Sequence, residues 1–461
     1  MNPKRRTLLK GLAVGGAAVG LGGVGLGHLQ AVGARRGADG AFVPGTTDQL
    51  AAWLRGTSGA VAIRGAGYSM GGQTQAGGGA QIDMRRMNRV VGFDGAAKTI
   101  RVQAGITWRA LLDHIDPKNL SVAIMQSYSN FSVGGSLSVN CHGRYVGAGP
   151  VVNSVRAIQL LTADGKLHEL RPGDPLFAGA IGGYGLVGVI TEVELGLVDN
   201  TRIQRETRRV ALADYPDFFA ESIQGRAVLH NADLMPPHFD APVAITWRRT
   251  EDQATIGVRL IARDQDYTTE QWELLAVSEL ASGPSLRQRY ETEPLERAGR
   301  VVCWRNHEAS LDARSLDPVR PALSEYLLQE YFIPVGAFHS FAREMQRTFA
   351  RYEPNVLNIS IRHSPADTST LLPWAKQEVF SFVVYHKQRL WAGDSSARGW
   401  SQRLIDAALD HGGRHYLPYR LHATKNQVER GYPGLDAMKQ LRAVHDPQRR
   451  MTNRMWQAYG V

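Results

Sequence analysis

A glycine-rich loop is the first feature of the sequence that can hold a ligand. Gly65, Gly67, Gly71 and Gly72 follow a short buried strand expected at Val61–Arg64. Glycines let the backbone take positive φ and bring its N–H groups close to a ligand, so such a loop can cradle a pyrophosphate. The loop does not match GxGxxG opening a helix with an acid about 20 residues later, which disfavours a nicotinamide-binding Rossmann site.

Further glycine-rich and serine-rich segments follow this loop in a fixed order. A strand near Ile100–Gln103 runs through Gly105 into a helix, and residues 126–144 carry many small side chains. A hairpin around Asp164-Gly165 comes next, and the glycine-rich residues 180–191 lead into another strand. In this order the segments resemble the FAD-binding domain of the vanillyl-alcohol oxidase or p-cresol methylhydroxylase (PCMH) type.

This resemblance covers about residues 45–200 and implies an α+β, two-domain PCMH-type FAD-binding fold with an antiparallel-sheet substrate (cap) domain. FAD is long, flat and doubly anionic at its centre, so it needs many backbone donors and few bulky side chains, and the 49 glycines of this chain fit that need. The residues that the resemblance places against FAD are Arg64, Gly65, Ala66, Gly67, Tyr68, Ser69, Met70, Gly71, Gln126, Ser132, Gly134, Gly135, Ser136, Asn140, Gly143, Val189 and Ile190.

Tyr68 departs from the pattern of the family. Many members have at this position a histidine that bonds covalently to the flavin, and some add a cysteine near the position of Asn130. Neither residue type is present, so we expect FAD to be held without a covalent bond. We interpret Cys141 as a small buried residue beside the cofactor.

Beyond Asp199 the sequence has fewer glycines and more aromatic, strand-like runs. These resemble the cap domain of the family over residues 201–410, and residues 411–461 resemble a C-terminal segment that returns to the FAD domain. The expected strands are Val243–Trp247, Ile256–Arg263, Glu330–Pro334, Val356–Arg362 and Val379–His386, and the expected helices are Thr46–Leu54, Tyr267–Glu279 and Phe338–Tyr352.

The resemblance also points to residues that face flavin and substrate. Oxidation of an alcohol at a flavin needs a base for the hydroxyl proton, and histidine is the commonest one. The candidates for catalysis or substrate contact are His142, Arg362, His415, Tyr416 and Tyr419, with His386 as a further possible base. Glu330, Lys387 and Lys425 we interpret as structural.

The layout is nearest to alditol and decaprenylphosphoryl-ribose oxidising members, with two departures. Tyr419 stands where the latter have lysine, and Ser360 stands where the former have an acid. The expected activity is therefore hydride transfer from a CH–OH donor, alcohol or sugar-like, to flavin N5, with oxygen or another acceptor reoxidising the flavin. A flavin-dependent reductase of a carbon–carbon double bond and a flavin-loaded, non-catalytic binding protein remain alternatives.

The N-terminus resembles an export signal of the twin-arginine (Tat) type. Lys4, Arg5, Arg6 and Lys10 precede an uncharged, glycine-rich run. We expect residues 1–34 to engage the Tat machinery, so that the protein is periplasmic or extracellular, either cleaved from its signal or anchored in the membrane.

Composition excludes several other classes. Two cysteines cannot build a disulfide framework, a CxxC zinc site or an iron–sulfur cluster. The net charge of +10 is dispersed beyond the N-terminus, without basic runs interleaved with aromatic residues, so nucleic acid is not an expected partner.

Overall fold

A four-stranded sheet and helix α1 (Thr47–Gly56) open the described part of the chain. In the computed structural model the described residues are 35–36, 40–262, 300–312, 324–389 and 393–461. Helix α1 begins after Thr46, whose hydroxyl accepts the N–H of Gln49 at 3.2 Å. The sheet has the order β1 (Arg35–Arg36), β2 (Phe42–Val43), β4 (Ala80–Asp83) and β3 (Val61–Arg64), with β4 parallel to β2 and β3.

A six-stranded antiparallel sheet follows. Its centre is the long strand β10 (Val189–Asp199), which pairs with β6 and β8 along its length and with β7 at its end. The other strands are β5 (Val90–Asp94), β6 (Thr99–Gln103), β7 (Leu120–Val122), β8 (Val155–Leu161) and β9 (Leu167–Leu170), and the helices beside them are α2 (Trp108–Ile115), α3 (Val133–Ser138) and α4 (Pro175–Ala180). The expected hairpin at Asp164-Gly165 is confirmed as the β8–β9 connection.

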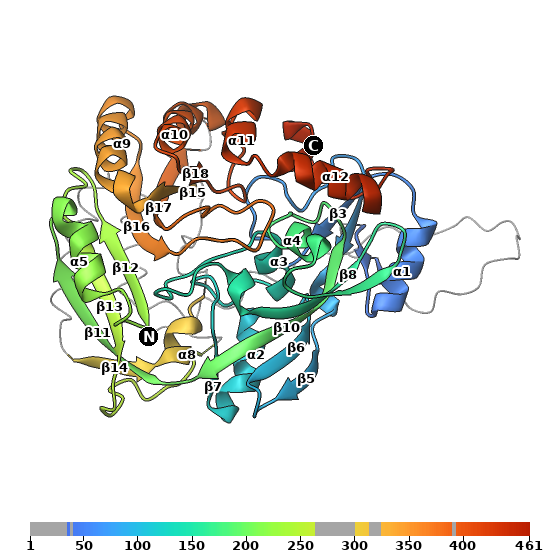
Figure 1. The fold of residues 1–461 in the computed structure, drawn as a ribbon, viewed down its shortest axis with the longest axis horizontal. Coiled ribbons are helices and arrows are strands. Elements are labelled where there is room, and N and C mark those ends of the chain that lie inside the picture. The colour runs from blue at the N-terminus through green and yellow to red at the C-terminus, as the bar shows by residue number, and fades with distance from the viewer. Residues whose placement is uncertain (1–34, 37–39, 263–299, 313–323, 390–392) are drawn as a thin grey trace, which may run out of the picture. The chain divides into compact units, whose positions relative to one another are not determined.

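The third sheet has eight strands, all antiparallel, and is built from the second half of the chain (Figure 1). This confirms the antiparallel sheet expected for the cap. Its order is β14 (Val301–Trp304), β11 (Arg202–Arg209), β13 (Val243–Arg249), β12 (Leu229–Leu234), β16 (Val356–Ser364), β17 (Val379–Arg389), β15 (Ser324–Pro334) and β18 (Arg414–His415).

Helices cover one face of this eight-stranded sheet. Phe380 and Phe382 of β17 contact Phe338 and Phe341 of helix α9, with ring centroids 5.1 Å apart in each pair. Side chains alternate along a strand, so the residues between these phenylalanines face the other way. The helices of this region are α5 (Tyr215–Ser222), α8 (Arg305–Ala309), α9 (Phe338–Tyr352) and α10 (Gly393–Asp410).

The C-terminal segment returns to the first sheet. The carbonyl of Arg450 accepts the N–H of Val61 at 2.7 Å, and the carbonyl of Val61 accepts the N–H of Thr452 at 3.0 Å. Met451 is buried in the same apolar cluster as Leu50 and Leu54 of α1. The last helices are α11 (Lys425–Gly431), α12 (Leu435–His445) and α13 (Arg454–Tyr459), and short 3-10 turns occupy Met84–Arg86, Asp116–Lys118, Val151–Ser154, Leu212–Asp214 and Val335–Ala337.

Most of the expected elements are found, but one is wrong. Residues 256–262 form no strand; they form bends, and the N–H of Ile256 binds the carbonyl of Val302 in β14. Arg259 in this segment forms an ion pair with Asp116 at 2.9 Å, and the N–H of Ile261 binds the hydroxyl of Ser310, so polar contacts replace a strand ladder. The helix expected at Tyr267–Glu279 and the signal expected in residues 1–34 lie outside the described residues.

None of the helices within the described ranges combines the length and the apolar character that a membrane span requires. The described residues from Arg35 to Val461 belong to one compact unit, and the expected boundaries at residues 200 and 410 stay predictions.

Candidate active site

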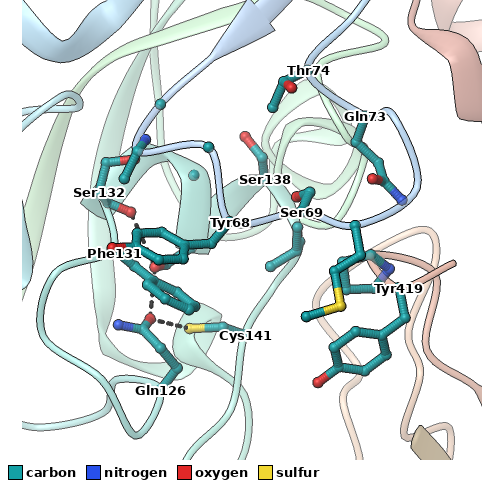
Figure 2. A pocket seen from close by; sticks show the side chains of 18 of the residues that line it. Tyr68, Ser69, Gln73, Thr74, Gln126, Phe131, Ser132, Ser138, Cys141 and Tyr419 are labelled. Carbon is teal, nitrogen blue, oxygen red and sulfur yellow. Dashed lines mark hydrogen bonds between the residues drawn. The ribbon is translucent and has the colours of Figure 1, made fainter. Parts of the chain in front are cut away.

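The central cavity lies where the glycine-rich loop, the 126–142 segment and the uncovered face of the eight-stranded sheet come together. Figure 2 shows the loop residues Tyr68, Ser69, Gln73 and Thr74 with Gln126, Ser132 and Cys141 around this space. The cavity is therefore formed by elements from both halves of the sequence.

Hydrogen bonds hold the two ends of the glycine-rich loop, and two backbone N–H donors in its middle have no partner among the described residues. The N–H of Ala66 binds the hydroxyl of Ser132 at 3.2 Å, and the N–H of Met70 binds the carbonyl of Pro418 at 2.9 Å. Between them, the backbone N–H groups of Gly67 and Ser69 make no hydrogen bond within the described chain. Unsatisfied N–H groups at a cavity wall suit an anionic ligand such as a diphosphate.

Small residues line this part of the cavity because larger ones do not fit. A Cβ at Gly65 would overlap the hydroxyl of Ser132, and one at Gly134 would lie 2.7 Å from the Cβ of Ala104. The buried hydroxyl of Ser127, which also lines the cavity, has no hydrogen-bond partner in the described chain. Backbone donors, an orphaned hydroxyl and a wall of small residues fit the diphosphate and flat ring of FAD.

A buried histidine–glutamate pair closes the cavity on the side of the eight-stranded sheet. His142 Nε2 lies 2.5 Å from Glu330 Oε1, and the Tyr419 hydroxyl donates to Glu330 Oε2 at 3.2 Å. His142 is 6% exposed and Glu330 2%. Burial of a carboxylate is costly unless it is hydrogen-bonded, and here both oxygens of Glu330 have partners.

The segment around His142 is tied to the second half of the chain by two further bonds. The Tyr416 hydroxyl donates to the carbonyl of Val139 at 2.8 Å, and the indole of Trp374 donates to the carbonyl of Asn140 at 2.8 Å. Trp374 also contacts the imidazole of His142, with ring centroids 4.8 Å apart. These contacts fix where the imidazole lies relative to the sheet.

The register of the sheet places a row of side chains on its cavity face. Ser360 pairs with Val383, and Val383 pairs with Glu330 on the next strand. Directly opposite residues share a face of an antiparallel sheet, and the N–H of Tyr416 bonds the carbonyl of Glu330, which continues the row. The same face carries Tyr326, Leu328, Arg362 and Tyr385, which line the cavity.

Arg362 is the cationic side chain that β16 contributes to the cavity. Its Nε is buried and has no acceptor in the described chain. A buried donor without a partner is costly, so this nitrogen suits an oxygen or nitrogen acceptor on a ligand.

Tyr68 lies at the cavity edge and is 40% exposed. Its ring stacks on Phe131 at 4.2 Å, and its hydroxyl accepts the side-chain amide of Asn130 at 2.6 Å. The ring is therefore held in place by stacking and by one hydrogen bond.

Most of the predicted site residues line the central cavity. They are Gly65, Ala66, Gly67, Tyr68, Ser69, Met70, Gln126, Ser132, Gly134, Gly135, Ser136 and Ile190 for the cofactor, and His142, Arg362, Tyr416 and Tyr419 for catalysis. The roles assigned to them stay predictions.

Five predicted cofactor residues lie outside the cavity lining. Arg64 and Gly71 line a second cleft on the opposite side of the loop. The Asn140 amide points to Asp367, at 2.9 Å, and Val189 packs in the apolar cluster of the first sheet. Gly143 packs so closely on the carbonyl of Met125 that a side chain has no room there.

His415 and His386 also lie away from the cavity. His415 is paired with Tyr331 across the strands β18 and β15, so it faces the helices, whereas the next residue, Tyr416, faces the cavity. The His386 ring meets Trp400 of α10 at 5.0 Å. Both positions follow from the alternation of side chains along a strand.

Glu330 is the residue that sequence reasoning interpreted as structural and the structure places against His142. Its sequence signal is a single acid directly before the apolar run Tyr331-Phe332-Ile333 in an expected strand. A lone carboxylate in a buried strand requires a hydrogen-bond donor or a cation beside it, and such a buried polar pair is a candidate for a functional site.

Comparison with known proteins identifies the glycine-rich region. A family model described as "FAD binding domain" matches residues 38–171. Residues 38–171 are an FAD-binding domain. The match includes the glycine-rich loop and the segment that carries His142.

Curated relatives match parts of the chain. Decaprenylphosphoryl-beta-D-ribose oxidase of Mycolicibacterium smegmatis is 37% identical over 134 residues, which are 28% of this chain and 29% of that protein. Alditol oxidase of a Streptomyces species is 36% identical over 104 residues, 23% of this chain and 25% of that protein. The chain therefore matches these relatives over less than a third of their length.

Solved structures extend the likeness to the cap sheet. A solvent-stable cholesterol oxidase superposes with a TM-score of 0.69 and 15% identity, covering 91% of this chain and 94% of that one. A cholesterol oxidase from B. sterolicum gives 0.69 and 14%, covering 91% and 93%. The FAD-binding domain is thus part of a PCMH-type FAD-binding fold, as expected from the sequence.

The buried His415 beside the FAD-binding fold leads to a prediction about acid stability. Burial lowers its pKa to about 4, because desolvation disfavours the charged imidazole. An unfolded histidine, with a pKa near 6.5, takes up a proton earlier, so the native state loses stability as pH falls from about 6.5 to 4. We expect His415→Phe to remove about 3 kcal/mol of this loss, measured as the free energy of unfolding in urea at pH 7 and pH 4 with saturating FAD.

The matched control is His339→Asn, on the exposed surface of helix α9. Its stability should follow that of the wild-type protein at both pH values. A His415→Phe protein that loses stability in parallel with the wild type would contradict the assigned cost of protonating this residue.

Proposed function

We propose that the protein is an FAD-dependent oxidoreductase that takes a hydride from a CH–OH donor, an alcohol or a sugar-like compound. The observation that carries the proposal is the buried His142–Glu330 pair at 2.5 Å, which joins the small-residue segment of the FAD-binding domain to the eight-stranded sheet at the cavity wall. The names of two relatives, an alditol oxidase and a decaprenylphosphoryl-beta-D-ribose oxidase, support an oxidised hydroxyl in the substrate.

FAD, when bound, supplies the acceptor for the hydride. His142 is suited to take the hydroxyl proton of the substrate. With Nε2 donating to the Glu330 carboxylate, the remaining lone pair of the imidazole lies on Nδ1, and the carboxylate stabilises the imidazolium that forms on proton uptake. Glu330 thereby fixes the tautomer and the orientation of the ring.

Tyr419 and Arg362 are suited to orient the substrate. The Tyr419 hydroxyl is held by Glu330, and it lines the cavity beside His142. The unsatisfied Nε of Arg362 is suited to bind a substrate oxygen or the electron-rich edge of the flavin. Tyr326, Leu328, Val383 and Tyr385 add apolar surface on the same face, which favours a donor with an apolar part beside its hydroxyl.

The proposed activity is tested by anaerobic reduction of the FAD-loaded protein with a panel of sugars, alditols and apolar alcohols. His142→Gln should slow bleaching of the flavin band by about 10²–10⁴-fold while FAD stays bound, because the hydroxyl proton then has no base. Glu330→Gln should also slow it, since a neutral amide stabilises the imidazolium less. His339→Asn, far from the cavity on α9, should react at the wild-type rate.

Other outcomes distinguish the alternatives. Bleaching by a nicotinamide donor, and by no alcohol, would indicate a reductase of a double bond. Resistance to every donor would indicate a flavin-loaded protein without turnover. Equal rates in wild type and His142→Gln would refute the assigned base.

We further propose that FAD is held without a covalent bond. Tyr68 supports this, because it stacks on Phe131 at the position where many family members carry the linking histidine. Acid precipitation of the purified yellow protein should release the flavin colour into the supernatant. Colour retained in the pellet would refute this proposal and leave the FAD-binding domain unaffected.

We also propose that the protein is exported by the Tat route, on the strength of Arg5-Arg6 and the uncharged run after it. Residues 1–45 fused to a folded reporter should direct the reporter across the inner membrane of a Tat-competent bacterium. The Arg5→Lys/Arg6→Lys fusion should stay inside. Equal export of the two fusions, or export in a strain lacking the Tat translocase, would exclude this route.

A further inference from the structure

A second cleft, the arginine cleft, lies on the other side of the glycine-rich loop. It has a volume of about 640 Å³ and is open to solvent. Elements far apart in the sequence meet in it: strand β3 and the loop, helix α10, the segment after β18, and the start of α13. Among its lining residues are Arg64, Gln75, Gln81, Arg398, Arg420 and Arg454.

The cleft concentrates positive charge. Four arginines line it, and none of the described lining residues is acidic. Arg420 pairs with Glu325 at 2.9 Å, yet its buried Nε has no acceptor. The guanidinium of Arg454 has no hydrogen bond or ion pair in the described chain. The aliphatic part of the Arg454 side chain packs over Gly72, which has no side chain to occupy that space. Arginine side chains gathered in a cleft whose described lining contains no acid can hold an anion by charge-assisted hydrogen bonds.

This charge is not directed at the central cavity. Ala66, Gly67, Ser69, Met70 and Thr74 line both spaces, so a single layer of loop separates them. None of the four arginines lines the central cavity. The diphosphate of FAD would therefore meet backbone N–H groups on one side of the loop, while the arginines face the other side.

The other residues that line the arginine cleft limit the kind of ligand it can bind. Apart from the arginines it consists of glycines, hydroxyl and amide side chains, and the aliphatic residues Ala66, Met70 and Leu421, with no aromatic residue among those described. A nucleobase or a lipid chain would find neither a stacking surface nor an apolar groove. The chemistry fits a compact, strongly hydrated phosphate group.

We propose that the arginine cleft is a second ligand site, distinct from the FAD site, that binds the phosphate group of a small phosphorylated molecule. Arg454 and Arg398 supply exposed donors at its mouth, and Arg420 supplies a donor deeper in the cleft. This proposal does not depend on the proposed oxidoreductase activity, because phosphate binding requires only the glycine-rich loop and the arginines.

The test is calorimetric titration of the FAD-loaded protein with inorganic phosphate and with pyrophosphate, at low ionic strength. We expect saturable binding with flavin absorbance unchanged. Arg398→Gln/Arg454→Gln should weaken pyrophosphate binding by at least about tenfold, because two charge-assisted contacts are lost. Both side chains are exposed, so folding should be preserved. Arg347→Gln, on the exposed surface of α9, removes one charge elsewhere and should bind as the wild type does.

A second arm separates a soluble phosphate from a lipid headgroup. Phosphatidylcholine vesicles with and without phosphatidic acid are sedimented with the protein. Retention on phosphatidic acid that pyrophosphate does not compete would overturn the soluble ligand. The same titration is repeated with FAD-free protein. Binding seen only in the absence of FAD would assign the cleft to the FAD site, and binding unchanged by the double substitution would show that the arginines do not hold the ligand; either result refutes the proposal.

Discussion

The contact between His142 and Glu330 is the constraint on which the candidate active site depends. His142 comes from the FAD-binding domain and Glu330 from the eight-stranded sheet, and both are almost fully buried. A carboxylate in such a place is stable only with hydrogen-bond donors, and the imidazole and the Tyr419 hydroxyl provide them. The two halves of the chain must therefore close on each other before either polar group is satisfied.

The rest of the structure keeps this closure in one arrangement. Helices α9 and α10 cover the back of the sheet with aromatic side chains, so its front is left to carry Glu330, Arg362 and the tyrosines. Trp374 and Tyr416 bind the backbone carbonyls of Asn140 and Val139, just before His142, and so fasten this segment to the second half of the chain. The geometry of a site formed between the FAD-binding domain and the eight-stranded sheet is set by how the two pack together. The small residues of the glycine-rich loop and of the 126–142 segment leave space for a flat cofactor.

Much of this was accessible from the sequence, and the misses have physical reasons. The helix at Phe338–Tyr352 and the strand Val61–Arg64 were predicted at their observed bounds, because hydrophobic periodicity is a local signal. His415 and Tyr416 could not both face the cavity, since adjacent strand residues face opposite sides; only the fold shows which one does. Asn140 and Val189 are near the cofactor segment in sequence, yet their side chains turn into the interior. The role of Glu330 could not be predicted because its partner, His142, lies 188 residues away in the sequence, and only the fold brings the two together.

The bond between Val61 and the residues around Met451 has a consequence for how the protein is made. The first sheet, which carries the glycine-rich loop, gains a neighbour that the ribosome delivers nearly 400 residues later. Contacts between residues so far apart in sequence form late and slowly, because the entropy lost in bringing the two segments together precedes the stabilisation that the contacts provide. The loop therefore reaches its final support only after synthesis of the chain is almost complete, and a stop codon a short distance before residue 450 should yield a chain that is retained by chaperones and does not hold FAD.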